Sequence, residues 1–157
     1  MSRPDMESTE PMQAIYARLL GRDLVVNRSK PGTREGNEAF EAEITQLLDA
    51  RAYEQAMEKL EAAAASDPDN AWIQHRMGIV NRVAGNFVVA LAHYTAALRL
   101  DADFPTGVAH YCYTLHQMGE TMRAVNILNF HLAINPQDKD AAKIQRMIAT
   151  RHGGTRG

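Results

Sequence analysis

The central part of the chain carries apolar residues at helical spacing, and this pattern returns with a period of 34 residues. The period is marked by three alanines, each followed four places later by a large apolar residue: Ala56 and Leu60, Ala90 and Tyr94, Ala124 and Leu128. A small residue one helical turn before a large one is typical of two helices that cross closely. The pattern therefore predicts three copies of one pair of helices, over residues 37–70, 71–104 and 105–138.

Turns and helix ends keep the same register. Gly85 and Gly119 each stand five residues before an alanine, where a chain leaving one helix needs a tight turn, and Arg51 has this place in the first unit. The units close at Asp67-Pro68, Asp101-Ala102 and Asn135-Pro136, and proline cannot continue a helix. Each unit is expected to hold a first helix, a turn and a second helix, which makes the fold all-α.

Residues 139–151 form an amphipathic segment after the last unit. Its apolar residues share one helical stripe: Ala141, Ile144, Met147 and Ile148. A terminal repeat has to cover its neighbour's apolar face and present a polar outer surface, so this segment is predicted to be a capping helix. Residues 152–157 are expected to fray as a tail.

Residues 1–36 are predicted to hold a short amphipathic helix and a flexible linker. Thr9-Glu10-Pro11 is typical of a helix start, and the apolar residues after it are spaced for one face: Met12, Ile15, Leu19 and Leu20. The run from Asn27 to Glu38 has linker composition. The detached helix has two interpretations: it folds back on the first unit, or it docks on a second copy of the chain and gives a homodimer through this helix or the first repeat.

Composition and charge narrow the classes of function. Of the 157 residues, 45% are hydrophobic and 23% are charged, so the chain is able to bury a core. A formal net charge of -2 lacks the basic footprint of nucleic-acid binding, and Met1 to Glu10 lack the apolar run of a secretory signal or membrane span. Cys112 is the single cysteine, which excludes an internal disulfide. We expect a cytoplasmic protein with no membrane insertion and no nucleic-acid partner.

The sequence lacks a recognisable catalytic or metal-binding motif. No two of the six histidines are three or four residues apart, so no helical metal pair exists. A serine nucleophile elbow, a phosphate-binding loop, a dinucleotide fingerprint and a zinc-protease motif are all missing. We therefore expect no cofactor and no metal, and we predict that the chain is not an enzyme.

The repeating unit resembles the tetratricopeptide repeat. In residues 71–104 the signature sites are occupied by Met77-Gly78, Gly85, Ala90, Tyr94 and Ala97, whereas Asn81 and Ala102 replace the usual tyrosine and proline. This resemblance, which covers residues 37–138, implies a right-handed α-solenoid of three helix pairs. It also implies that the first helices of the units line a concave groove that grips an extended peptide of another protein.

The resemblance assigns residues of the first helices to this groove. They are Glu38, Glu41, Thr45 and Leu48, then Trp72, His75, Ile79 and Arg82, then Thr106, Ala109, Tyr113 and His116. Trp72, Ile79 and Tyr113 make the groove apolar and aromatic, although packing between helices is the alternative role for Trp72 and Tyr113. Repeat proteins that bind the C-terminal carboxylates of chaperones use a basic clamp. Glu38 and Glu41 stand where its cations are wanted, which disfavours that role.

A longer stretch, residues 78–128, is similar to the middle of type III secretion class II chaperones. The similar positions are Ala84-Gly85-Asn86-Phe87, Ala90, His93, Tyr94, Phe104-Pro105, Ala109, Cys112, Leu115, Gly119-Glu120 and Ala124. Such chaperones keep hydrophobic translocator subunits soluble in the bacterial cytoplasm, and several self-associate through their first helices. The resemblance implies a chaperone of this kind. The alternatives are a scaffold or adaptor for a multiprotein complex and, third, a regulatory subunit linked to an enzyme.

Overall fold

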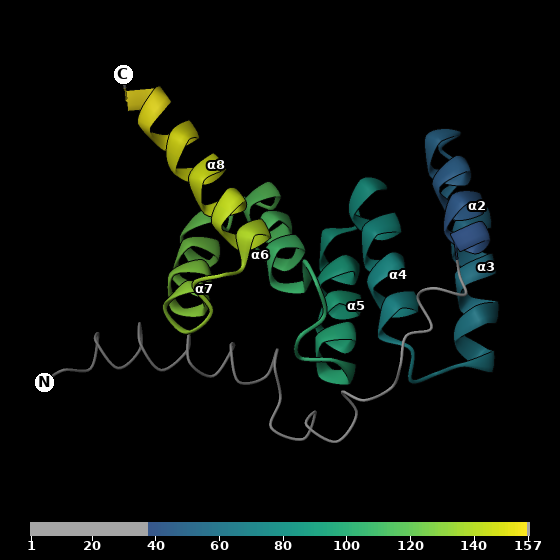
Figure 1. The fold of residues 1–157 in the computed structure, drawn as a ribbon. Coiled ribbons are helices and arrows are strands. Elements are labelled where there is room, and N and C mark those ends of the chain that lie inside the picture. The colour runs from purple at the N-terminus through teal and green to yellow at the C-terminus, as the bar shows by residue number, and fades with distance from the viewer. Residues whose placement is uncertain (1–37, 157) are drawn as a thin grey trace, which may run out of the picture.

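The computed structural model describes residues 38–156, which form seven helices and no strand. The helices follow one another as an array (Figure 1): α2 (Glu38–Asp49), α3 (Tyr53–Ser66), α4 (Ala71–Val83), α5 (Phe87–Leu100), α6 (Gly107–Gln117), α7 (Thr121–Ile134) and α8 (Lys139–Arg156). Each helix packs against the next one along the chain, and α8 also packs against α6. The prediction of an all-α fold built from stacked helix pairs is confirmed.

The 34-residue register of the sequence is also the register of the packing. The pairs α2–α3, α4–α5 and α6–α7 fall inside the three predicted units. All six marker residues have no exposed surface: Ala56, Leu60, Ala90, Tyr94, Ala124 and Leu128. Each small–large pair therefore stands on the buried side of a second helix, as close helix crossing requires.

Gly78 shows how closely α4 and α5 approach each other. A Cβ atom added at Gly78 would lie 2.5 Å from Cε1 of Tyr94, which is far inside van der Waals contact. The Tyr94 ring is fully buried, so it has no open space into which to retreat. The glycine of the Met77-Gly78 site is thus required by the neighbouring aromatic ring.

The turn inside each helix pair repeats one hydrogen-bonded geometry. The backbone N–H groups of Ala52, Asn86 and Glu120 each donate to the carbonyl five residues earlier, at 2.8, 2.7 and 2.8 Å. The residue before each donor has a positive φ: 61° at Arg51, 93° at Gly85 and 90° at Gly119. A positive φ followed by a hydrogen bond to the carbonyl five residues earlier is a common way for a helix to end, and the residue with positive φ is usually glycine.

Arg51 adopts this left-handed conformation without being glycine, which costs about 1 to 2 kcal/mol for a residue with a Cβ atom. We expect Arg51→Gly to raise the free energy of unfolding by about 0.5 to 1 kcal/mol, because the relief outweighs the extra entropy of an unfolded glycine. Urea unfolding followed by circular dichroism measures the change. Gly85→Ala is the matched reverse variant and should lower stability, and a destabilised Arg51→Gly protein would contradict this account of the turn.

Helix α8 follows the third pair and is longer than the sequence predicted. Asp138 caps it, because the N–H of Ala141 donates to Asp138 Oδ1 at 3.0 Å. Ala141 and Ile148 are buried where α8 packs against α6 and α7. The helix continues to Arg156, through most of residues 152–157, whose fraying as a tail stays a prediction. Two successive glycines weaken a helix by only about 1 kcal/mol each, and no proline interrupts the segment.

The predicted N-terminal helix and linker, residues 1–36, lie outside the described residues. Their docking on the first unit or on a second copy stays a prediction. Among the described helices, none combines the length and the apolar composition that crossing a bilayer demands.

Two apolar clusters fill the array, and Phe104 contacts both. The first cluster lies among α2, α3 and α4 and includes Ile44 and Trp72. The second extends from α5 to α8 and includes Tyr94 and Ile148. Phe104 stands in the turn between α5 and α6, so this turn lies where the two cores meet.

Candidate functional site

Side chains from α2, α4 and α6 meet along one side of the array, which we call the first-helix face. Between α2 and α4, the rings of Phe40 and Trp72 pack with centroids 6.1 Å apart. Arg76 stacks over the Trp72 ring at 5.1 Å and forms an ion pair with Glu41. The first two units are therefore joined here by aromatic, cation–π and ionic contacts.

Arg82 joins the second and third units on the same face. Its guanidinium stands over the ring of Tyr113 at 5.5 Å, and its Nη1 donates to Gln117 Oε1 at 3.5 Å. Its Nε donates to the hydroxyl of Tyr94 at 3.3 Å. Arg82 thus contacts α5 and α6 from the end of α4, and its charge is held beside an aromatic surface.

The structure separates the predicted groove residues into a buried and a partly exposed set. Trp72, His75 and Ala109 are only 3 to 4% exposed, so their side chains are largely buried within the first-helix face. The partly exposed set comprises Leu48, Ile79, Arg82, Thr106, Tyr113 and His116. For Trp72 the alternative of packing between helices is what the structure shows, because its indole is covered by Phe40 and Arg76. Whether either set meets a partner stays a prediction.

Two histidines lie side by side beneath the first-helix face. The rings of His75 and His110 meet edge to face with centroids 4.7 Å apart. His75 also packs on Phe104 at 4.7 Å and on Tyr94 at 5.1 Å, and we call these four residues the histidine cluster. His110 and Phe104 were missed as site residues. The signal for His110 was its place one helical turn after Thr106, on the same stripe of α6.

Burial and nearby cations keep both histidines uncharged near neutral pH. Burial lowers the pKa of His75 well below 6.5, and His110, Arg76 and Arg82 lower it further. The pKa of His110 falls to about 4, again through burial first and then through Arg82 and Arg76. A neutral imidazole offers one N–H donor and one acceptor nitrogen, so the cluster is suited to hydrogen bonding.

A cavity of about 180 Å³ opens between α6 and α8 beside the histidine cluster. Its lining residues are Thr106, Ala109, His110, Tyr113, Asp140, Lys143 and Ile144. The structure thus brings together three predicted groove residues, Thr106 just before α6 and Ala109 and Tyr113 on α6, with polar residues of α8. The sequence did not predict this contribution of α8.

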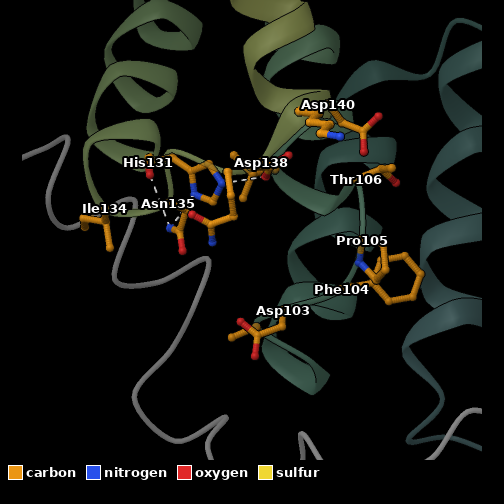
Figure 2. Close-up of a pocket in the computed structure, with 13 residues that line it drawn as sticks. Asp103, Phe104, Pro105, Thr106, His131, Ile134, Asn135, Asp138 and Asp140 are labelled. Atoms are coloured by element: carbon orange, nitrogen blue, oxygen red, sulfur yellow. Dashed lines mark hydrogen bonds and ion pairs between the residues drawn. The ribbon is translucent and has the colours of Figure 1, made fainter.

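A larger cavity of about 730 Å³ lies between the α5–α6 turn and the α7–α8 turn. Figure 2 shows Phe104, Pro105 and Thr106 on one side of it, facing His131 and Asn135 on the other. His131 Nε2 lies 2.8 Å from Asp138 Oδ2, the residue that caps α8. His131 therefore ties α7 to the start of α8, which accounts for a histidine where the repeat usually has a small residue.

Cys112 is fully buried in α6, and burial raises the pKa of its thiol. The thiolate, which is the reactive form of cysteine, is accordingly disfavoured. Cys112 is a small residue of the core. Across residues 38–156, no group of three or more histidine, cysteine or acidic residues is placed to hold a metal ion.

Comparison with known proteins gives distant matches. No family model matches the chain. The "Probable biofilm formation methyltransferase WspC" of Pseudomonas putida is 28% identical over 93 residues, which is 59% of this chain and 22% of that protein. The "Protein O-mannosyl-transferase TMTC1" of Mus musculus is 36% identical over 67 residues, or 43% of this chain and 7% of that protein. The chain thus spans less than a quarter of either relative. The fold and these matches are compatible with a tetratricopeptide-type repeat protein.

The prediction that the chain is not an enzyme is contradicted by the first match, because that relative is named a methyltransferase. The prediction rested on missing motifs, and such a search tests only the motifs that are sought. It also considered the chain by itself, whereas the matched segment is a small part of a longer protein.

Proposed function

We propose that this chain binds an extended segment of another polypeptide across the first-helix face. The observation that carries the proposal is the row of partly exposed side chains that α4 and α6 present together. Ile79 and Arg82 come from α4, Tyr113 and His116 come from α6, and Arg82 stacks on Tyr113 between them. Aromatic and arginine side chains beside apolar ones are the composition of protein-binding surfaces.

The partner is the finer part of the proposal. The similarity of residues 78–128 to type III secretion class II chaperones favours a hydrophobic translocator subunit as the client. A scaffold in the assembly of a multiprotein complex is the alternative, with the same face and a different client. Both versions need an accessible face with apolar and aromatic side chains, so one binding experiment on the first-helix face tests both.

A second candidate is a repeat module that works with an enzyme. The match to a relative named a methyltransferase favours it, since the shared 93 residues are about a fifth of that protein. In this version the first-helix face would hold a protein substrate or regulator of the enzyme. Co-purification of a methyltransferase with the full chain would support this candidate over the chaperone.

Selection of short random peptides on the immobilised full chain, followed by fluorescence anisotropy, tests the proposal. The variant Ile79→Glu with Tyr113→Glu should weaken binding of the selected peptides by at least about tenfold, because both side chains leave the apolar surface. The helical circular dichroism signal should persist, since both sites are partly exposed. Trp72 is not used, because a glutamate at its buried site would disrupt the core.

The matched control is Val88→Glu with Met122→Glu. These residues are 70% and 68% exposed on the second helices α5 and α7, and they stand 34 residues apart in the repeat. Binding should stay unchanged in this variant. If the control pair abolishes binding and the first-helix pair does not, the partner binds the opposite side and the proposal fails.

A further inference from the structure

Several buried side-chain nitrogen atoms on the first-helix face have no hydrogen-bond partner among residues 38–156. Among them are Trp72 Nε1, His75 Nδ1 and His110 Nδ1. A buried polar group without a partner costs about 1 to 3 kcal/mol, and folded proteins satisfy nearly all such groups. His75 touches His110 on α6, so these two nitrogens belong to one place, and Trp72 stands three residues before His75 on α4.

The charges around this place favour an anion. After burial, which is the larger cause, the nearby cations Arg76 and Arg82 both lower the pKa of the two histidines, so two positive charges stand near the cluster. Arg76 is paired with Glu41, whereas Arg82 faces the neutral partners Tyr94, Tyr113 and Gln117 in the contacts described above. The charge of Arg76 is therefore balanced by the Glu41 carboxylate. The positive charge of Arg82, in contrast, is directed toward α6.

One member of the cluster, His110, is also reached from the surface. His110 lines the cavity of about 180 Å³ between α6 and α8, together with Tyr113 and two residues of opposite charge, Asp140 and Lys143. This volume is several times the roughly 30 Å³ that a water molecule occupies in the liquid, so a side-chain group fits in it. An acidic side chain of a bound segment is of fitting size, and its charge is opposite to that of Arg82.

We infer that the histidine cluster receives the carboxylate of an aspartate or glutamate side chain of the bound segment, next to Arg82. This inference rests on the proposed function and adds the chemistry that the partner must present. The carboxylate accepts hydrogen bonds from the histidine N–H groups, and such bonds to a charged acceptor are about twice as strong as neutral ones. Glu38 and Glu41, which stand where a basic clamp would need cations, both lie on α2 in the first unit.

The experiment uses the peptides selected on the full chain. They are expected to share one acidic position, and its change to the matching amide, Asp→Asn or Glu→Gln, should weaken binding to the wild-type protein at least about tenfold. The same change should alter binding by less than about twofold in His75→Phe and in Arg82→Gln, because the receiving site is then lost. His93→Phe on α5 and the exposed Arg123→Gln on α7 are matched controls that should keep the full effect.

A stability measurement separates a binding role of His75 from a merely structural one. Phenylalanine keeps the ring contacts with Tyr94 and Phe104 and removes the unsatisfied nitrogen. The melting temperature of His75→Phe should therefore stay the same or rise while affinity for the acidic peptide falls. A fall in both would indicate that His75 only supports the fold, and it would overturn the inference.

The remaining outcomes are also decisive. Selected peptides without an acidic preference would overturn this inference and leave the proposed function standing, whereas failure to select any peptide would remove both. Each acidic peptide is also tested with a free and an amidated C-terminus. If only amidation weakens binding, the carboxylate comes from the end of the chain and the assignment to a side chain is wrong.

Discussion

Replacing Tyr94 with alanine is expected to lower the free energy of unfolding by about 3 to 5 kcal/mol, the usual cost of deleting a large buried ring. Tyr94 has no exposed surface, it fills the space over Gly78, and its hydroxyl accepts a hydrogen bond from Arg82. Urea unfolding followed at 222 nm measures the loss. Tyr94→Phe removes only the hydroxyl and should cost about 1 kcal/mol, which serves as the matched control.

The contact with Gly78 makes this prediction sharper. In the wild-type chain, Gly78→Ala should cost about 1 to 3 kcal/mol, because its methyl group would overlap the Tyr94 ring. In the Tyr94→Ala chain the same change should become neutral or stabilising, since alanine favours a helix over glycine by about 1 kcal/mol. Equal costs in the two backgrounds would show that α4 and α5 do not cross at this pair of residues.

Acidification below pH 6.5 is expected to destabilise the fold through the histidine cluster. The folded-state pKa values of His75 and His110 lie below the unfolded value of 6.5, so the unfolded chain binds more protons as the pH falls. Their contribution to stability is therefore complete above pH 6.5 and is lost on the way down to pH 4. For His110, whose pKa is about 4, the loss amounts to about 3 kcal/mol at 1.36 kcal/mol per pKa unit.

The contribution of the two histidines is isolated by measuring the free energy of unfolding at pH 7 and at pH 4. The wild type is compared with the double variant His75→Phe with His110→Phe. The variant keeps the carboxylates of the wild type, so acid effects from those groups cancel in the difference. The wild type should lose at least about 3 kcal/mol more than the variant over this range. Parallel curves would mean that the two histidines titrate normally in the folded protein.

The sequence alone was sufficient to predict the repeat and its register. Small–large pairs such as Ala90 and Tyr94 are local signals, because four residues place them on the same side of one helix. Arg51 was recognised as the residue at the glycine position, and the structure shows that it keeps the glycine-like backbone. Such patterns can be recognised in the sequence because turns and helix crossings depend on nearby residues.

The details of the face could not be predicted, because they depend on contacts between units. The burial of Trp72 follows from Phe40 on α2, and that of His75 follows from Phe104 and His110. His131 stands where the repeat usually has a small residue, and its partner Asp138 lies seven residues later, across a turn. The periodic pattern contains no information about such pairs, and it contains none about the contribution of α8 to the cavity.

The most direct test of the account is to locate a bound peptide on the molecule. Amide chemical-shift changes are recorded for the isotope-labelled full chain as a selected peptide is added. The largest changes should fall on α4 and α6 around Ile79, Arg82 and Tyr113, with smaller ones on α2. Changes concentrated on α3, α5 and α7 instead would show that the first-helix face is not where this protein holds its partner.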